Sequence, residues 1–511
     1  MDILGLAEVP GWLLTIFLLI LSLYLYSKYK LSFWSRLRVP HPKPTLFLGH
    51  AKLMKDGIGE FDLKMIRTYD RVVGTYILHR PTLLILDPEL ARDILIKNFF
   101  MIPNTSFIFK QRTGLGQALT RQKGDRWRFM RNTISPIFSS GKMRKISPIL
   151  AESCGSLLTN VEKEANCGHS MEFRRIFGNF TMDAIAGIGF GIKLDAYGEE
   201  NNEFILNAKA IFDNFIGYGT FINAFMPPLY NLLFKLRLDL DKQTKSDMFF
   251  KGLVEQAENL RGGHQDRVDI LQLLLNAHRD TEISDTEQTL EYEDGKGNWE
   301  KRGLSKEEVS GNSTLFMVAG YETTATTLTF AAYCLATHLN YQEQLIAEID
   351  STIGQETPDY DNIQKIEYLD CVIKETLRLY PPAQRIQRET HQEMEIGGVV
   401  IPPNTPVSVP IYGFHRSPKF WSDPEVFNPD RFLEKNKSKL IPGAFLPFGL
   451  GPRSCIAMRL AYMEAKCALI TILQKYKFIP CEQTEIPVEL DGRFFLKPKN
   501  GIVLKLGKRE T

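Results

Sequence analysis

One cysteine, Cys455, stands at the end of a glycine-rich run, Phe448–Ala457, and just before a stretch from Met458 to Tyr476 that favours a helix. Backbone N–H groups in a tight turn and the N-terminus of a helix both favour the charged thiolate. A thiolate that holds a haem iron pushes electron density onto the metal, which favours O–O cleavage. The competing interpretation is a buried structural cysteine, because most lone cysteines are of that kind.

A second run of residues that could take part in a reaction is Ala319–Thr324, inside a long helical pattern. Glycine within a helix costs about 1 kcal/mol relative to alanine, so Gly320 requires a reason. Close approach of a flat ligand and a local break in the helical hydrogen bonds would supply one, with the Thr323 hydroxyl and Glu322 beside the ligand. The alternative is a threonine bonded back to its own helix and a solvated glutamate.

Two further patterns place charged groups beside bulky ones. Glu375 and Arg378 stand three residues apart on one helix face, and the prolines that follow end the helix among apolar residues. Most such pairs lie on the surface, but this setting favours burial. Trp127 and Arg131 lie one helical turn apart and offer two donors to a carboxylate or propionate. The alternative for that pair is an ordinary amphipathic helix with one buried tryptophan.

Composition excludes several classes of protein. The 511 residues carry 62 basic and 60 acidic side chains, a net charge of +2, so no nucleic-acid partner is expected. The 7 cysteines are scattered and include no CxxC pair. That pattern argues against a disulfide framework and a zinc site, and it fits a reducing compartment.

The N-terminal stretch 9–27 contains no charged residue and would span ~28 Å as a helix, close to the hydrocarbon thickness of a bilayer. It predicts a retained transmembrane anchor rather than a cleaved signal peptide, because no basic region precedes it and no small-residue cleavage site follows. Basic residues after it place the remainder in the cytosol. Residues 28–44 predict a basic, proline-rich hinge that acts as a stiff spacer, and 45–511 a single catalytic domain.

The elements that must position these residues are mostly helices with a small β portion. A hairpin is expected from Thr75–Leu78 and Leu83–Leu86, and helices from Pro88 to about Leu275. The segment Arg279–Arg302 reads as an exposed loop, and Ser305 with Glu308 forms a capping box that begins a helix to about Thr337. Later strands are expected at Met394–Ile401, at Pro406–Pro410 and near both ends of Val488–Leu506.

In this order the motifs resemble a microsomal cytochrome P450 over essentially the whole chain: anchor, proline hinge, WxxxR, AGxET, ExxR, a PxRF-type segment and the cysteine loop. Within the family the chain is most similar to the 3A-type drug and steroid monooxygenases, through Ala319–Thr324, Gly451–Arg459 and Phe138–Lys142. A related second resemblance, to thromboxane synthase, rests on His41–Pro44 and the long insert before Leu304.

The resemblance implies a cytochrome P450 fold and a role for each matching residue. Cys455 would be the thiolate ligand of the iron in haem b, with Phe448 packed on the thiolate side. The haem propionates would be held by Trp127, Arg131, Arg388 and Arg453. Glu375, Arg378 and Arg431 would form a buried charge network under the cysteine loop. Thr323 and Glu322 would deliver protons to dioxygen. One departure is Ala457, where the family usually has glycine, and we expect it to tune function rather than abolish it.

The resemblance also implies a substrate pocket and partners. An apolar pocket suits lipophilic substrates such as steroids, fatty acids or foreign compounds. Its expected wall residues are Phe107, Phe109, Phe212, Phe215, Phe316, Ala319, Ala383, Ile386 and Phe494. NADPH-cytochrome P450 reductase, possibly joined by cytochrome b5, would supply electrons to a protein anchored once in the endoplasmic reticulum membrane. A basic cluster would steer the acidic reductase: Arg126, Arg128, Lys142, Arg144 and Lys145.

Three functions stay open at this point. The first is an unspecific monooxygenase that uses NADPH through a reductase. The second is a P450 isomerase that acts on a lipid endoperoxide, like thromboxane synthase, and needs no oxygen activation. The third is a non-catalytic haem binder or gas sensor. The intact pair Glu322 and Thr323 favours the first over the second, and the aromatic-rich pocket disfavours the third.

Overall fold

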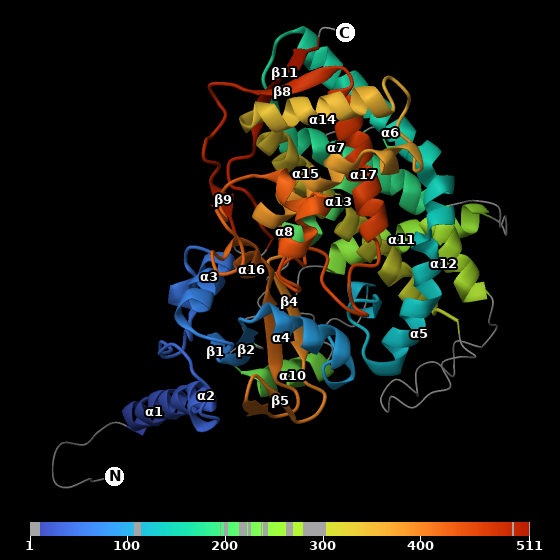
Figure 1. Ribbon diagram of the computed structural model, residues 1–511. Coiled ribbons are helices and arrows are strands. Elements are labelled where there is room, and N and C mark those ends of the chain that lie inside the picture. The colour runs from blue at the N-terminus through green and yellow to red at the C-terminus, as the bar shows by residue number, and fades with distance from the viewer. Residues whose placement is uncertain are drawn as a thin grey trace.

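The molecule is a large helical body with a smaller β-rich part beside it (Figure 1). The computed structural model describes residues 11–106, 114–194, 196–198, 203–213, 222, 226–236, 238, 244–261, 269–279, 303–492 and 495–509. Buried apolar side chains form two clusters, one among the helices and one around the largest sheet. The expected mostly helical fold with a small β portion is confirmed.

Helix α13, Lys306–Thr337, runs through the centre of the helical body (Figure 1). Its start has the predicted capping box, because the Ser305 hydroxyl accepts the N–H of Glu308 and the Glu308 carboxylate accepts the N–H of Ser305 at 2.8 Å. The helix is continuous through Gly320, so it lacks the local break that was one of the two alternatives for this glycine. A methyl group at Gly320 would lie 3.0 Å from Ile185 of α7 (Phe173–Phe190), so this glycine permits two helices to pack closely.

Several helices pack around α13, and α7, α11, α12, α15 and α17 contact it directly. Helix α17 ends at Leu473, three residues before the predicted end, because the chain from Tyr476 pairs as a strand. The remaining helices are α3 Ile58–Thr68, α4 Pro88–Arg92, α5 Gly124–Ile134, α6 Ser140–Asn166, α8 Glu203–Asp213, α10 Pro227–Lys235, α11 Thr244–Arg261, α12 Ile270–Arg279, α14 Leu339–Thr352, α15 Glu367–Leu379, α16 Ile411–Arg416 and α17 Met458–Leu473.

The largest sheet has the strand order β1-β2-β7-β4. Strands β1 (Val72–Ile77) and β2 (Arg80–Ile85) pair antiparallel, which confirms the predicted hairpin. Strand β7 (Pro406–Pro410) runs parallel to β2 and antiparallel to β4 (Arg385–Glu389). The predicted strand at 394–401 is a hairpin of two short strands. The remaining strands are β3 Met171–Glu172, β5 Met394–Ile396, β6 Val399–Ile401, β8 Tyr476–Pro480, β9 Leu490–Asp491, β10 Lys497–Pro498 and β11 Val503–Lys508.

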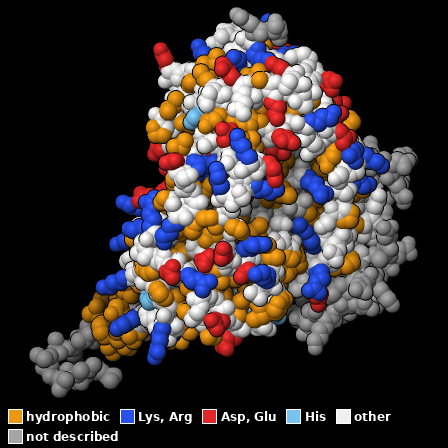
Figure 2. Space-filling view, in the orientation of Figure 1, with side chains coloured by type: hydrophobic (Ala, Val, Ile, Leu, Met, Phe, Trp, Pro, Cys, Tyr) orange, Lys and Arg blue, Asp and Glu red, His pale blue; other side chains and the backbone are white. Residues whose placement is uncertain are grey.

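Helix α1, Gly11–Leu31, projects from the β-rich part and exposes its apolar side chains (Figures 1 and 2). Within the described residues it is the one helix long and apolar enough to cross a membrane. Its last turn is docked, because the Ser27 hydroxyl lies 2.8 Å from Nε2 of His79 in the hairpin turn. The segment after it is docked too. Trp34, in α2 (Phe33–Arg36), is fully buried, and its indole donates to the Thr75 carbonyl at 2.9 Å.

Candidate functional site

The cysteine loop is held in a tight turn by two glycines. Gly449 and Gly451 have φ angles of 73° and 74°, which favour glycine over other residues. A side chain at Gly451 would also overlap the carbonyl oxygen of Leu95, in the short helical turn Asp93–Lys97. The N–H of Cys455 donates to the Phe448 carbonyl at 2.8 Å and closes the loop. The glycine-rich sequence is therefore required by the backbone that presents the cysteine.

Cys455 borders a cavity that residues of the cysteine loop and of α17 also line. Its side chain is accessible in the protein alone. Burial raises the pKa of the Cys455 thiol, against the opposing effects of the Ala457 N–H and the positive charge of Arg131. The backbone N–H is the kind of group that the sequence predicted would stabilise the thiolate, whereas the effect of Arg131 was not predicted, and desolvation is larger than both.

The cavity has a volume of about 450 Å³ and is bordered by Cys455, by α13 and by the strand β4. Four predicted wall residues line it, namely Phe316, Ala319, Ala383 and Ile386. Thr323 and Phe448 also line it. The other predicted wall residues lie outside the described residues or side chains: Phe107, Phe109, Phe212, Phe215 and Phe494.

Three arginines near the cavity are buried or partly buried. Among the described residues, none of Arg131, Arg388 and Arg453 pairs with a carboxylate. Burial lowers the pKa of Arg388 to about 10, and its Nε has no hydrogen-bond partner in the described part of the chain. Burial and then repulsion by Arg388 and Arg131 lower the pKa of Arg453 to about 9. Burial also lowers the pKa of Arg131. These three cations therefore have no anionic partner among the described residues.

The predicted Trp127 belongs to the same corner of the site. The Arg453 guanidinium lies over its ring, 4.2 Å from the ring centroid. Arg453 also donates to the Gln122 carbonyl at 2.8 Å and to the Pro103 carbonyl, so its position is fixed. Trp127 and Arg131 do not border the cavity as the protein alone defines it, whereas Arg388 and Arg453 do.

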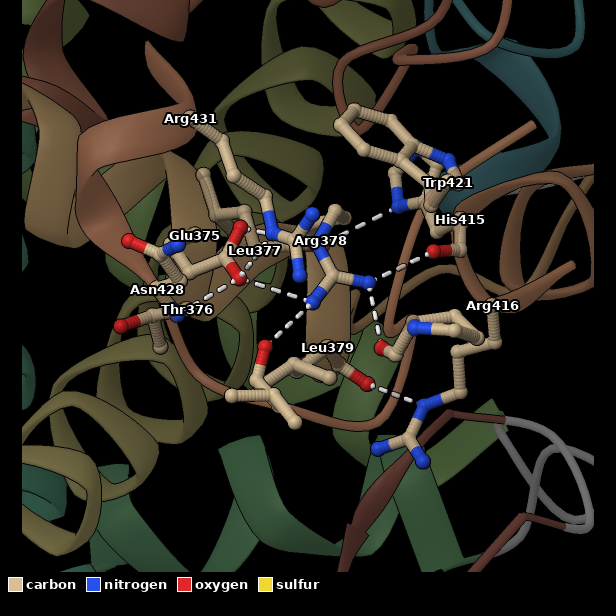
Figure 3. Close-up of polar contacts among 12 residues, drawn as sticks. Glu375, Thr376, Leu377, Arg378, Leu379, His415, Arg416, Trp421, Asn428 and Arg431 are labelled. Carbon is tan, nitrogen blue, oxygen red and sulfur yellow. Dashed lines mark hydrogen bonds and ion pairs between the residues drawn. The ribbon is translucent and has the colours of Figure 1, made fainter. Parts of the chain in front are cut away.

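Glu375, Arg378 and Arg431 form the buried network that the sequence predicted (Figure 3). Glu375 and Arg378 are completely buried and form two parallel hydrogen bonds of 2.8 Å, and Arg431 reaches the same carboxylate at 3.3 Å. Arg378 also donates to the carbonyls of His415 at 2.9 Å and Pro424 at 2.7 Å. The network joins α15 to the chain that leads into the cysteine loop.

His415 is a site residue that sequence reasoning missed. Its Nδ1 lies 3.2 Å from the Leu377 carbonyl on α15, and its Nε2 accepts the N–H of Leu446 at 3.0 Å just before the cysteine loop. Burial and then repulsion by Arg378 lower the pKa of His415 to about 3, so the ring is neutral and accepts one bond while donating the other. A lone histidine between Phe414 and Arg416 in a short helix gives no signal for this role.

Glu322 and Thr323 are adjacent in the sequence but lie in different surroundings. Thr323 lines the cavity, and its hydroxyl donates to the Ala319 carbonyl at 2.7 Å, which is the backbone bond that the sequence left open. Glu322 does not border the cavity and accepts a 2.7 Å bond from Arg174 on α7. Their joint role in proton delivery stays a prediction.

The basic cluster needs one correction. Arg126 is buried and pairs through both nitrogens with Glu308 at the start of α13, so it is not part of a surface patch. Its neighbour Arg128 is exposed, as is Lys145, whereas Lys142 is partly buried. Arg144 is exposed and pairs with Asp361 at 2.9 Å.

The fold and the cysteine site together define a haem-thiolate protein, and the chain belongs to the cytochrome P450 family. The family pattern for Cytochrome P450 matches residues 39–506. The chain is 35% identical to Cytochrome P450 3A12 of Canis lupus familiaris, over 100% of this chain and 99% of the relative. It is 34% identical to Cytochrome P450 3A29 of Sus scrofa and 34% identical to Cytochrome P450 3A2 of Rattus norvegicus, with 100% of this chain and 99% of each relative covered.

The residues present fit the haem that the family implies. Haem would require a side chain that ligates its iron and cations that pair with its two propionates. The cavity offers Cys455 for the first and the arginines without acid partners for the second. Cys455 would hold the iron, and Arg388 and Arg453, with Arg131 and Trp127, would hold the propionates. The family membership supports a haem monooxygenase.

Proposed function

We propose that this protein inserts one oxygen atom of O₂ into a lipophilic substrate, using electrons from NADPH that arrive through a reductase. One observation carries the proposal: Cys455 and Thr323 border the same apolar cavity, together with Phe316, Ala383 and Ile386. A site lined mainly by apolar side chains with few polar groups suits a steroid, a fatty acid or an apolar foreign compound.

Bound haem supplies the oxygen-activating chemistry, and the chain supplies the surroundings. Cys455 would hold the iron and push electron density onto it, from a loop whose shape Gly449 and Gly451 fix. The apolar walls hold the substrate and exclude water. Thr323 presents a hydroxyl to the cavity, and a threonine that bonds back to its helix can turn that hydroxyl to a new acceptor at the loss of one bond, about 1 kcal/mol.

The partners follow from charge and from the N-terminal helix. The exposed residues Arg128, Arg144 and Lys145, with the partly exposed Lys142, support an acidic electron donor such as NADPH-cytochrome P450 reductase, with cytochrome b5 as a second donor. Helix α1 supports a single-pass anchor in the endoplasmic reticulum membrane. Lys28, Lys30 and Arg36 after its apolar part favour a cytosolic catalytic domain.

The test uses membranes that contain the full chain and added reductase, incubated with a mixture of lipophilic compounds, with and without NADPH. We expect substrate loss and products heavier by one oxygen atom only when NADPH and O₂ are present. Label from ¹⁸O₂ should appear in the product. A Cys455→Ala variant serves as the control, and it should lose both the product and the carbon monoxide difference band of a thiolate-ligated haem.

A second function, isomerisation of a lipid endoperoxide, is supported by one observation. The carboxylate of Glu322 accepts a hydrogen bond from Arg174, and Glu322 does not border the cavity. The acid of the pair that favoured a monooxygenase over an isomerase therefore lies away from the cavity. An isomerase would convert the endoperoxide without NADPH and without reductase. The same incubation without NADPH therefore separates the two functions.

A further inference from the structure

Helix α5 carries two neighbouring stripes of side chains, each made of residues four apart. Trp127 and Arg131 form one stripe, and it belongs to the arginine corner of the site, since the Arg453 guanidinium lies 4.2 Å from the centroid of the Trp127 ring. Arg126 and Met130 form the other stripe. Each member of it precedes a member of the first by one residue, which is about 100° around the helix axis. A rotation of α5 that moves one stripe therefore moves the other.

The stripe of Arg126 and Met130 is attached to α13. Arg126 donates from Nε to one oxygen of Glu308 at 2.6 Å and from Nη2 to the other oxygen. The side chains of Arg126 and Glu308 are 7% and 0% exposed. One helical turn farther along α13, Asn312 donates from Nδ2 to the Met130 sulfur at 3.4 Å. Both contacts join the start of α13 to the face of α5 that lies next to Trp127 and Arg131.

The acceptor side of this attachment is itself fixed in place. The Glu308 carboxylate also accepts the N–H of Ser305 at 2.8 Å, as the second half of the capping box. The side chain of Asn312 accepts the N–H of Leu119 at 2.9 Å and donates to the Glu308 carbonyl at 2.7 Å. Leu119 lies in the chain that leads into α5. The first turns of α13 thus form a rigid support for α5 and for the segment before it.

A buried ion pair is a poor device for stability alone. Replacing such a pair with apolar side chains of similar volume is often neutral or stabilising, whereas removing one partner is strongly destabilising. What the pair provides and apolar contacts lack is direction, because two parallel hydrogen bonds between a guanidinium and a carboxylate are satisfied in only one relative orientation. The pair of Arg126 and Glu308 therefore defines the rotation of α5 about its own axis.

We propose that Arg126 and Glu308 are positioning residues of the haem site. Their ion pair sets the rotation of α5, and that rotation aims the indole of Trp127 and the guanidinium of Arg131 at the haem propionates. Neither Arg126 nor Glu308 touches the haem, and each acts through the neighbouring stripe. The proposal rests on the haem-binding site of the proposed function.

The first test compares haem environment and haem retention in single variants, and it does not depend on turnover. Resonance Raman spectra of the full-length holoprotein report the bending bands of the propionates, and transfer to a haem-free acceptor protein reports the rate of haem loss. Arg126→Met should shift the propionate bands and raise the rate about tenfold, the loss expected for one charge-assisted hydrogen bond. Glu308→Gln should change both in the same direction but less, because its amide oxygen still accepts one bond from Arg126.

Two matched variants control for the loss of a charge and for the loss of the helix cap. Arg128 lies on the same helix with a side chain that is 70% exposed, so Arg128→Met removes a cation without releasing α5. Ser305→Ala removes the hydroxyl that caps α13 but leaves the ion pair in place. Both should keep the wild-type propionate bands and the wild-type rate of haem loss. Changes as large as those of Arg126→Met in either control would overturn the proposal.

The double variant Arg126→Met with Glu308→Met separates positioning from stability. Because two apolar side chains leave no unpaired charge, the midpoint of urea unfolding should return toward the wild-type value. The propionate bands should stay shifted and haem loss should stay about tenfold faster, because the direction supplied by the ion pair is still missing. If the bands and the rate recover together with stability, the pair only holds the fold and the proposal is wrong.

The outcomes also separate the proposal from the function on which it rests. A wild-type protein that takes up no haem overturns both. A wild-type protein that binds haem but forms no oxygenated product with NADPH and reductase refutes the proposed function alone, and the Raman bands and the haem-loss rates still decide the role of the pair. If Arg126→Met does not fold, Glu308→Gln and the double variant decide instead.

Discussion

Two sets of buried charges, the network around Glu375 and the groups at the cavity wall, differ in how their polar atoms are paired. Glu375 and Arg378 have 0% exposed side chains and use nearly every donor and acceptor on each other and on nearby carbonyls (Figure 3). At the cavity, Arg388 has an Nε without a partner and Glu464 an oxygen without one, within the described residues. Burial of a charge without a partner is costly. We therefore infer that the Glu375 network stabilises the fold, whereas the groups at the cavity interact with a bound molecule.

The largest effect is expected where a fully paired charge is broken. Glu375→Gln leaves Arg378 buried without its anion, and such a loss costs ~3–5 kcal/mol. We expect little folded protein and almost no carbon monoxide difference band, measured together with the midpoint of urea unfolding. Asp125 and Arg128 have the same three-residue spacing but are each 70% exposed, so Asp125→Asn is the matched control and should change stability by less than ~0.5 kcal/mol. Equal effects of the two substitutions would contradict the comparison.

A smaller and opposite effect is expected where the charge lacks a partner. Arg388→Gln removes a cation that has no acid beside it in the protein alone, so the stability of the haem-free protein should not fall. Haem retention should fall, because a charge-assisted hydrogen bond is worth ~1.5–3 kcal/mol, or ~10- to 100-fold in the rate of haem loss. Transfer of haem to an excess of a haem-free acceptor protein measures that rate. Exposed Arg144→Gln is the control, and an equal rate in both variants would argue against a propionate contact.

A third prediction concerns the pH dependence of stability that results from His415, whose ring contacts the backbone of Leu377 and Leu446. The pKa of His415 is lowered from its ordinary value of about 6.5 to about 3 in the folded protein. Between these two pH values the ring is protonated in the unfolded chain but neutral in the folded protein. Stability from this group is therefore present above about pH 6.5 and is lost as the pH falls, at up to ~1.4 kcal/mol per pH unit. His415→Gln should flatten this slope in urea unfolding curves taken between pH 7 and pH 5. Exposed His169→Gln controls for loss of a surface histidine.

The smallest effect is expected at Ala457, the departure from the family pattern. It occupies the N-cap position of α17 with φ −96°, which alanine adopts without strain. Glycine is a better N-cap than alanine by up to ~1 kcal/mol, so Ala457→Gly should change stability by no more than that. Because residue 457 borders the cavity, the Soret absorption of the haem should shift slightly. A loss of haem in this variant would show that the methyl group is a required contact.

Much of the site could be predicted because local sequence determines it. The capping box at Ser305 and Glu308, the hairpin at β1 and β2, and the glycine-bearing turn at Cys455 each depend on neighbours a few residues apart. The three-residue spacing of Glu375 and Arg378 also predicted that the two side chains lie on one helix face and can form an ion pair. The network then needed only burial, which the following prolines indicated.

Contacts between distant segments could not be read from the sequence. Nothing near Glu322 indicates that Arg174, 148 residues away, would hold its carboxylate. The same is true of Arg126 and Glu308, which turned a residue of the expected surface patch into a buried one. Glu464 has an ordinary place in an amphipathic helix, and only the packing of α17 on α13 shows that it reaches the cavity.

The docking of Trp34 has a practical consequence for preparing a soluble form of the enzyme. Removing the exposed part of α1 eliminates the apolar surface that promotes aggregation, but the cut must fall before Ser27 if the contact with His79 is to survive. A cut after Arg36 would also empty the slot that the indole fills above Gly74, where the ring lies against the strand. Loss of a buried tryptophan costs ~3–5 kcal/mol, so a shorter chain that is more soluble would also be less stable.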